Sequence, residues 1–235
     1  ALACALGLDA APAHMQRVGN CTYLLVARYD RQRSANGAWV RLHQEDFCQA
    51  LGVVPETKYQ NEGGPDLAQS FALLRRATRP SAPQLLKLLD YVIFHTLIGN
   101  HDAHGKNFSL LYAGKSAVLA PLYDVLSTAV YPTLTPKMAM KIGSKYKFSE
   151  VQAQHWEQFA EAVGLSKAQA RKRILALAKS MPSTARELQS DPGRGFTCHG
   201  VVEQIVTLIE QRCAPTVRRL SAPAADLEEG TEPCQ

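Results

Sequence analysis

Residues 99–108 have the sequence GNHDAHGKNF, and this stretch decides what we expect of the fold and of the chemistry. It follows a long apolar segment that ends at Gly99, which predicts a loop between a buried helix and a strand. Asp102 and Asn107 lie five positions apart in this loop, and another acidic residue, Asp124, follows downstream. Phosphoryl transfer needs one carboxylate that orients the attacking hydroxyl, and an amide and a second carboxylate that bind metal. Asp102, Asn107 and Asp124 fit these three roles in that order.

The residues that follow the loop predict a β-hairpin. Residues 108–112 (FSLLY) and 117–123 (AVLAPLY) have the composition of two strands, and residues 113–116 (AGKS) form the turn between them. Such a hairpin would return Asp124 to the side of the loop. Asp and Asn are also common in ordinary turns, which their side chains cap, so the spacing alone does not decide for catalysis. Loop, hairpin and returning aspartate together favour the active-site floor of a kinase-like fold.

Four separated stretches also resemble a known family. They are LLVARYDR, RLHQEDFCQALG, IGNHDAHGKNFSLLY and LAPLYDVLSTA, in this order along the chain. They are similar to the C-terminal part of HipA, the serine/threonine kinase toxins of bacterial toxin–antitoxin pairs. The resemblance extends by motif from Leu24 to Ile142 and is weaker beyond. It implies an α+β, mainly helical fold: a protein-kinase-like C-terminal lobe with a catalytic-loop hairpin and a remnant of the N-terminal lobe.

The resemblance also implies roles for the matching residues. Asp102 would be the catalytic base, and Asn107 and Asp124 would hold Mg²⁺. In this family the hinge that contacts adenine usually carries Glu where this chain has Ala27. From its charge, Lys106 is a candidate to neutralise the transferred phosphoryl group. The implied ATP-binding residues are Ala27, Arg28, Tyr29, His104, Gly105, Lys106, Asn107, Tyr123 and Asp124.

The function implied by the resemblance is transfer of the γ-phosphoryl group of ATP, with Mg²⁺, to a serine or threonine of a protein. The expected substrate is an aminoacyl-tRNA synthetase, and the expected partner is a HipB-like, DNA-binding antitoxin. Direct sequence-specific binding to nucleic acid is not expected.

Two alternatives stay open. Nothing before Val26 resembles the phosphate-covering loop or its strand lysine, so a fragment or an inactive pseudokinase that binds a partner is the second hypothesis. The spacing of Asp102, His104 and Asn107 also occurs in lipid-kinase-like enzymes, so a small-molecule or lipid kinase is the third. A metal site built from His101, Asp102 and His104 is disfavoured, because three ligands so close in one loop would strain the backbone.

The expected division of the chain has three parts. Residues 1–30 would be a remnant of the nucleotide-covering lobe with the hinge, and residues 31–221 the kinase lobe. Residues 222–235 would be a disordered acidic tail, since they hold four acidic and no basic residues. The net charge of +5 therefore leaves about +9 on the rest of the chain, which suits either an acidic partner or a solvated surface.

Composition is that of a globular protein. The chain has 235 residues, of which 46% are hydrophobic, and no apolar run reaches membrane-spanning length. No signal peptide is visible. The six cysteines form no C-x-x-C pair, which favours reduced thiols and a cytoplasmic location.

Local patterns predict the remaining elements. Gly19-Asn20 indicates a hairpin of residues 15–18 and 22–27, and its apolar stretch 23–26 is expected to be buried. His95 is expected to be a core histidine, and Lys137 and Lys141 to share one face of a strand over 137–142. The predicted helices are 44–51 with Gly52 as C-cap, 66–78 with Asp66 as N-cap, 84–98, 150–163, 167–181 with Pro182 as its stop, and one from 201 to 212 or beyond.

Overall fold

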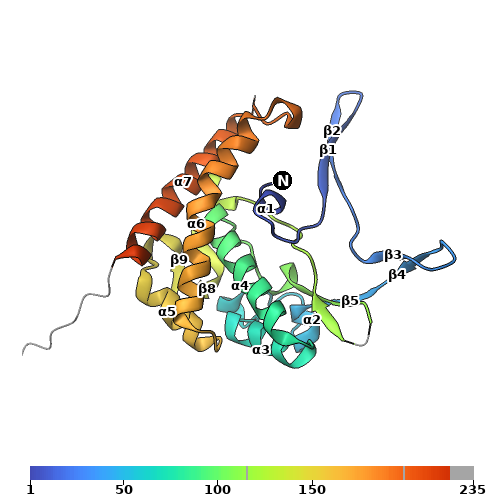
Figure 1. Cartoon of the computed structure of the whole chain (residues 1–235), viewed down its shortest axis with the longest axis horizontal. Coiled ribbons are helices and arrows are strands. Elements are labelled where there is room, and N and C mark those ends of the chain that lie inside the picture. Colours follow the sequence, from blue (N-terminus) through green and yellow to red (C-terminus); the bar gives the residue numbers. More distant parts are fainter. Residues whose placement is uncertain (115, 198, 223–235) are drawn as a thin grey trace, which may run out of the picture.

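The computed structural model describes residues 1–114, 116–197 and 199–222. Its centre is a body of packed helices, and two β-hairpins project from one side of this body (Figure 1). The predicted acidic tail lies outside the described residues from position 223 onward, as do Lys115 and Cys198. Within the described part, no helix is both long and apolar enough to cross a membrane.

The helices hold the largest share of the structure. Helix α4 is the central one, and its residues from Tyr91 to Ile98 are all buried, as its apolar circumference predicted. Helices α6 and α7 pack lengthwise on each other and cover α4 from one side (Figure 1). The helices are α1 (Leu2–Ala5), α2 (Phe47–Leu51), α3 (Leu67–Ala77), α4 (Ser81–Ile98), α5 (Ala153–Ala162), α6 (Lys167–Ser190) and α7 (Gly200–Ser221).

In the described part of the chain, the strands form four small antiparallel sheets, of which the three-stranded sheet β5-β6-β7 supports the site. Its strands β6 and β7 form the predicted hairpin after residue 108. Strand β5 pairs with the other side of β6, where Asp46 lies opposite Ser109. The strands are β1 (Ala13–Val18), β2 (Cys21–Val26), β3 (Arg31–Arg33), β4 (Trp39–Arg41), β5 (His43–Asp46), β6 (Ser109–Tyr112), β7 (Ala117–Leu119), β8 (Lys137–Ile142) and β9 (Lys145–Lys147).

Several local predictions are confirmed. Asp66 caps α3 and forms a reciprocal capping box with Gln69. Gly52 and Gly99 end α2 and α4 in the left-handed conformation, with φ of 70° and 75°. Lys137 and Lys141 are both exposed on β8, while Met138, Ala139 and Met140 between them are buried. The described cysteines Cys4, Cys21, Cys48 and Cys213 are free thiols.

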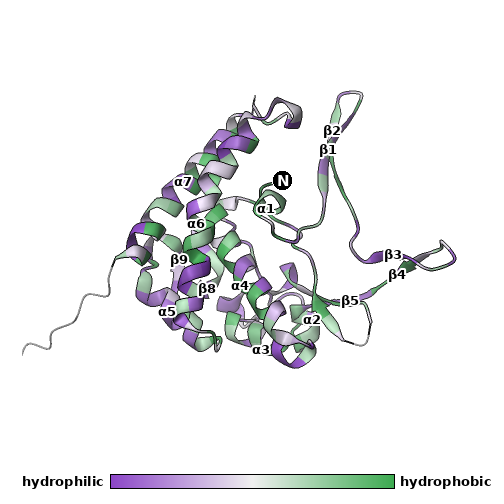
Figure 2. Cartoon of the chain, viewed as in Figure 1, coloured by the Kyte–Doolittle hydropathy of each residue, from purple (hydrophilic) through white to green (hydrophobic). Residues whose placement is uncertain are grey.

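Three predictions are wrong. The stretch 23–26 is exposed, with Leu24 63% accessible, because β1 and β2 form a two-stranded hairpin to which no other described strand adds. Figure 2 shows hydrophobic residues on this projecting hairpin as well as on the packed helices. Residues 43–46 are strand β5, not the start of a helix, because β6 offers them a pairing edge.

The third error concerns Pro182, which does not end its helix: α6 continues to Ser190. A proline inside a helix costs about 3 kcal/mol, since it removes a backbone donor and crowds the preceding turn. Met181 and Ala185 on either side of it are buried in the packed body. The hydroxyls of Ser183 and Thr184 also donate to the carbonyl oxygen of Ser180. This packing outweighs the local preference for a break.

Candidate active site

The central loop starts where α4 ends. Gly99 takes a left-handed turn there, and a Cβ at this position would lie 2.7 Å from Leu208 of α7 and 2.8 Å from Ala129. Only glycine therefore allows the loop to leave α4 so close to these neighbours. The short 3₁₀ turn η2 (Gly105–Asn107) completes the loop before β6. Gly105 is also closely packed, since a Cβ would lie 2.9 Å from Cys48 and from Pro65.

The loop and the segment that contains Asp124 are brought together, as the hairpin predicted. The Asn107 side-chain amide donates to Oδ2 of Asp124 at 2.6 Å, and its carbonyl oxygen accepts from the backbone N–H of His104 at 3.0 Å. Asp124 has φ +53°, and among the described residues it is the one non-glycine residue with positive φ. Such a conformation costs on the order of 1–3 kcal/mol and persists only where the surroundings impose it.

Asn100 joins the same two segments, and sequence reasoning gave it no role. Its side-chain oxygen accepts from the backbone N–H of Asp102 at 3.0 Å. Its side-chain amide lies 3.0 Å from Nδ1 of His95 and 3.5 Å from the carbonyl oxygen of Asp124. The one signal in the sequence was its position two residues before Asp102, where protein kinases carry a histidine. Asn100 is buried, and its side chain connects the backbone of Asp102 to that of Asp124.

Asp102 itself is partly open to solvent, with its side chain 40% accessible. Its Oδ1 accepts a hydrogen bond of 2.6 Å from the hydroxyl of Tyr59. Its Oδ2 has no hydrogen-bond partner among the residues that the structure describes. His104 Nε2 lies 3.9 Å from Oδ1, and burial, followed by the charge of Lys58, lowers the pKa of His104. His104 is therefore neutral at neutral pH.

Two further histidines at the loop, His95 and His101, are structural. Burial lowers the pKa of His95 to about 4, which confirms it as a core histidine. His101 Nδ1 lies 3.1 Å from the carbonyl oxygen of Thr135, and its Nε2 lies 2.8 Å from Nη2 of Arg212. Since a guanidinium only donates, Nε2 must accept and Nδ1 must carry the proton. Both nitrogens are thus engaged, and the described residues contain no group of three or more His, Cys, Asp or Glu side chains that could hold a metal ion.

Arg212 is the second residue that sequence reasoning missed. It lies on α7, it is 7% accessible, and it has no carboxylate partner among the described side chains. Nη1 donates to the carbonyl oxygen of Thr96 at 2.8 Å, and the guanidinium lies 4.5 Å from the Phe148 ring centroid. Burial lowers the pKa of Arg212 to about 10, so it remains charged at neutral pH. Arg212 thus connects α7 to His101, the residue next to Asp102.

The predicted hinge residues have different surroundings. Tyr29 stacks on Tyr123 with a centroid distance of 5.7 Å, so it lies beside the Asp124 segment. The Tyr123 hydroxyl donates to the carbonyl oxygen of Lys106 at 2.7 Å and also contacts Ser109. The Arg28 guanidinium binds the Asp30 carboxylate, and the backbone N–H of Ala27 donates to the carbonyl oxygen of Pro12. The Lys106 side chain is half-buried, and within the described part of the chain it forms no ion pair.

The Asp30 contacts lead to a testable pH dependence. Arg28 and Arg31 lower the pKa of the buried Asp30 carboxyl from 3.8 to about 2. Because the folded-state pKa lies below the unfolded value, Asp30 stabilises the fold above pH 4 and loses this effect as the pH falls toward 2. We expect Asp30→Asn to lower the free energy of unfolding at pH 7, measured by urea titration. The difference in this free energy between variant and wild type should shrink as the pH falls from 4 toward 2. A difference that stays constant with pH would contradict this assignment.

Two cavities lie at the site, one lined by Asp124 and the other by Asp102. The first, about 460 Å³, lies between the projecting hairpin, α1, α7 and residues 122–127, and Leu24, Val26, Tyr123 and Asp124 are among its lining residues. Ala27, Arg28 and Tyr29 do not line it. The second, about 650 Å³, is lined by Asp102, Tyr59 and Lys137 among others. We call them the Asp124 cavity and the Asp102 cleft. Both cavities have the size of small-ligand sites. Asp102 and Asp124, which Asn100 connects, line different cavities.

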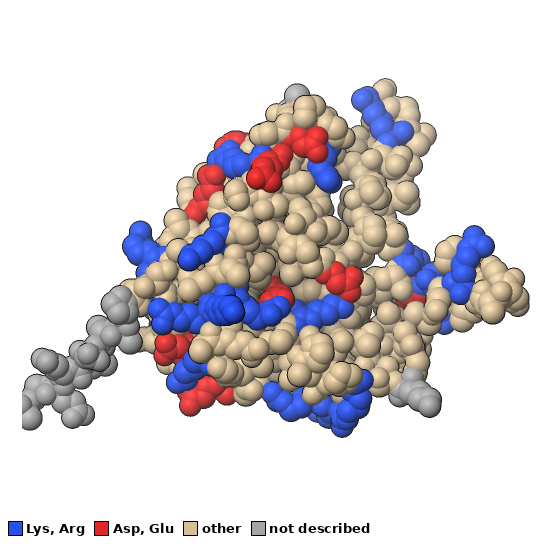
Figure 3. All heavy atoms as spheres, in the orientation of Figure 1, with Lys and Arg blue, Asp and Glu red and all other residues tan. Residues whose placement is uncertain are grey.

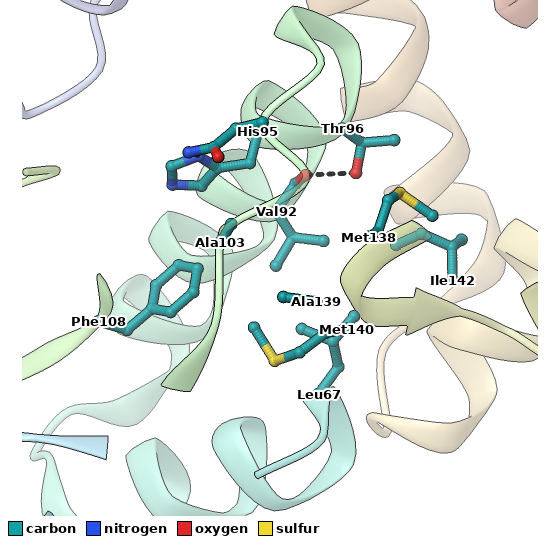
Figure 4. A pocket seen from close by; sticks show the side chains of 11 residues that line it. Leu67, Val92, His95, Thr96, Ala103, Phe108, Met138, Ala139, Met140 and Ile142 are labelled. Atoms are coloured by element: carbon teal, nitrogen blue, oxygen red, sulfur yellow. Dashed lines mark hydrogen bonds between the residues drawn. The ribbon is translucent and has the colours of Figure 1, made fainter. Parts of the chain in front are cut away.

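Behind the loop, the structure is tightly packed. Figure 4 shows a buried space there, lined by Val92 of α4, Ala103 and Phe108 from the loop, and Met138 and Met140 of β8. Its volume of about 20 Å³ accommodates about one water molecule, not a substrate. Packed side chains thus support Ala103 and Phe108 of the loop.

Charged side chains are distributed over the surface. Figure 3 shows Lys and Arg grouped across the helical face and at the tips of the projecting hairpins, with acidic side chains between them. Closer to the Asp102 cleft, Lys137 and Lys141 are exposed on β8, and the half-buried Lys145 lies on β9 next to it. This basic strip borders the cleft through Lys137.

The chain is similar to known proteins along most of its length. The model of the HipA-like C-terminal domain matches residues 1–185. A protein of Sinorhizobium fredii named "Putative kinase Y4mE" is 49% identical over 190 residues, which are 81% of this chain and 45% of that protein. The "Serine/threonine-protein kinase toxin HipA" of Shewanella oneidensis is 28% identical over 199 residues, covering 80% of this chain and 46% of the relative. The chain thus spans about half the length of these curated relatives.

Solved structures share the fold. A Shewanella oneidensis complex of HipA, HipB and operator DNA contains a chain that superposes with a TM-score of 0.80 at 23% identity, over 94% of this chain and 56% of that one. The Helicobacter pylori proinflammatory kinase CtkA superposes with a TM-score of 0.60 at 15% identity, over 94% and 80% of the two chains. At these identities the likeness concerns the fold, a mixture of helices and small sheets.

Proposed function

This chain belongs to the family of HipA-like C-terminal domains, and from this premise we propose that it forms the catalytic part of an ATP-dependent protein kinase that modifies serine or threonine. The observation that carries the proposal is that Asn107 bonds to the Asp124 carboxylate, while the buried Asn100 bonds to the backbone of both Asp102 and Asp124. Among the described residues, we find no contact that favours a kinase of lipids or small molecules instead.

Each residue has a proposed role that follows from its contacts. Asp102 orients and accepts the proton of the acceptor hydroxyl, since its Oδ2 is free and its side chain is accessible. Asn107 and Asp124 hold Mg²⁺, since amide and carboxylate oxygens are the hard ligands that this ion prefers. When bound, the ion would neutralise charge on the nucleotide phosphates. For this, Asp124 Oδ2 must exchange its present bond from the Asn107 amide N–H for the ion, and the Asn107 side-chain oxygen, which now accepts from the backbone N–H of His104, must also reach the ion.

The two cavities suit the two substrates. We assign the base and sugar of ATP to the Asp124 cavity, because Leu24, Val26 and Leu122 give it an apolar lining and Asp124 lies at its edge. We assign the acceptor to the Asp102 cleft. His104, Gly105 and Lys106 lie in the loop directly before Asn107, which bonds to Asp124, and we assign the phosphates to these residues. Residues 1–30 would then belong to the nucleotide-covering side and residues 31–221 to the kinase lobe.

The proposed substrate and partner come from the relatives. One relative is named as a serine/threonine kinase toxin, and one structural neighbour is a complex with HipB and operator DNA. We propose a HipB-like antitoxin as partner of the natural protein and an aminoacyl-tRNA synthetase as its substrate. Sequence-specific DNA contacts would be made by that partner.

Binding of ATP and Mg²⁺ provides the direct test. At 100 times its dissociation constant, ATP–Mg²⁺ is expected to raise the free energy of unfolding of the full-length gene product by about 2.7 kcal/mol. The measurement is a thermal or urea unfolding series with and without Mg²⁺. Asp124→Asn should remove most of the Mg²⁺-dependent part, and Asn is the appropriate replacement because it tolerates the positive φ of this position. No stabilisation by ATP in the wild type would favour an inactive, partner-binding module instead.

A further inference from the structure

Tyr59 contacts the proposed catalytic base, although nothing in its own sequence surroundings marked it. It lies 43 positions before Asp102, in the irregular segment between α2 and α3, and its hydroxyl donates to Asp102 Oδ1 at 2.6 Å. Its ring packs edge-on against His104 with a centroid distance of 5.2 Å and an interplanar angle of 80°. Tyr59 also lines the Asp102 cleft. It therefore touches two residues of the loop and borders the space assigned to the acceptor.

The segment that carries Tyr59 is held in place independently of this bond. Its next residue, Gln60, accepts a hydrogen bond of 2.9 Å from the backbone N–H of Lys141 on β8. The Tyr59 carbonyl oxygen accepts from the backbone N–H groups of Glu62 at 3.0 Å and Gly64 at 2.8 Å. A Cβ on Gly64 would overlap with the backbone of Lys58, so only glycine fits this turn. Tyr59 is thus presented by an anchored turn.

We infer that Tyr59 is a positioning residue for phosphoryl transfer: it fixes the Asp102 carboxylate so that Oδ2 faces the acceptor hydroxyl in the cleft. This inference rests on the proposed function, because it assigns Asp102 the role of base. A carboxylate held by one charge-assisted hydrogen bond loses rotational freedom about its last torsion and presents its second oxygen in one direction. The phenol remains a donor throughout the neutral range, since burial and the neighbouring Asp102 raise the pKa of Tyr59 to about 12.

Steady-state kinetics of Tyr59→Phe test this role. The variant keeps the ring against His104 and removes only the hydroxyl. With γ-labelled ATP, and transfer to the protein itself or to dephosphorylated casein as readout, we expect kcat to fall about 10- to 100-fold, the range for one hydrogen bond to a charged group. The KM for ATP and the melting temperature should stay within error of wild type. Tyr131→Phe is the matched control, because Tyr131 is an exposed tyrosine of the segment after Asp124 and should have no effect.

Two results would overturn the inference. A kcat of Tyr59→Phe within twofold of wild type would show that the bond is dispensable. A higher kcat would show that Tyr59 occupies the acceptor position and blocks it.

A titration separates this inference from the proposed function. In protein labelled with ¹³C at the tyrosine Cζ, Tyr59→Phe assigns the signal, and its midpoint in wild type should lie near 12. In Asp102→Asn, the Tyr59 pKa should be lower than in wild type, because the negative charge is lost while burial, the larger cause of the rise, remains. If wild type transfers no phosphate, the proposed function fails while this coupling still stands. If the midpoint is the same in both proteins, Tyr59 does not hold Asp102 and the inference fails.

Discussion

Asp102→Ala in the full-length gene product is expected to lower phosphoryl transfer by about 10²- to 10⁴-fold, the range that positioned general bases contribute. The loss should appear in kcat, because Asp102 lines the acceptor cleft whereas the Asp124 cavity is the one assigned to ATP. Transfer is measured with γ-labelled ATP, and ATP–Mg²⁺ binding is measured by thermal stabilisation in the same preparation. Stabilisation similar to wild type would show that the nucleotide still binds.

The control for this variant is Glu157→Ala, which removes another carboxylate from an exposed position on α5. It should transfer phosphate at the wild-type rate. Wild-type turnover in Asp102→Ala would refute the role of Asp102 as base. A variant that neither transfers phosphate nor is stabilised by ATP–Mg²⁺ would point to a wider disturbance of the loop. Asp102→Asn, which keeps the shape of the side chain, would then show whether loss of the carboxylate alone stops transfer.

Phe71→Ala is expected to lower the free energy of unfolding by about 3–5 kcal/mol, the usual cost of removing a large core side chain. Phe71 lies on α3 with no accessible surface, and its ring meets that of Phe159 on α5 edge-on at a centroid distance of 5.8 Å. Truncation would leave a cavity between α3, α4 and α5 that rigid helices fill only in part. Urea unfolding monitored by circular dichroism measures the effect.

The matched control is Val54→Ala, which removes apolar atoms from a residue that is 58% accessible. Its effect should remain within about 0.5 kcal/mol. A loss below about 1 kcal/mol for Phe71→Ala would mean that the helices around α4 can collapse into the space. The core that supports the site would then be less rigid than its packing indicates.

The parts of the site that lie in one short segment could be predicted from the sequence. Gly99 ends α4 because of its left-handed conformation, and Asp66 starts α3 because its side chain caps the first turn. The hairpin of β6 and β7 follows from two apolar runs around a short turn, and it returns Asp124 to Asn107. In each case the interaction that decides the structure joins residues close in sequence, so the pattern of residue types contains it.

The rest depends on partners far away along the chain. Tyr59 reaches Asp102 across 43 positions, and Arg212 reaches His101 across 111. No local pattern distinguishes either residue from an ordinary surface tyrosine or arginine.

By itself, the sequence determined the loop, the hairpin and the identity of the three polar residues that the proposed chemistry needs. Only the tertiary structure decided that Asn100 and Tyr59 bond to Asp102, and that Arg212 bonds to the neighbouring His101. It also decided that the stretch 23–26 is exposed and that α6 continues through Pro182. The physical reason is that burial and long-range hydrogen bonds, which arise only when distant segments pack together, outweigh local preferences of a few kcal/mol.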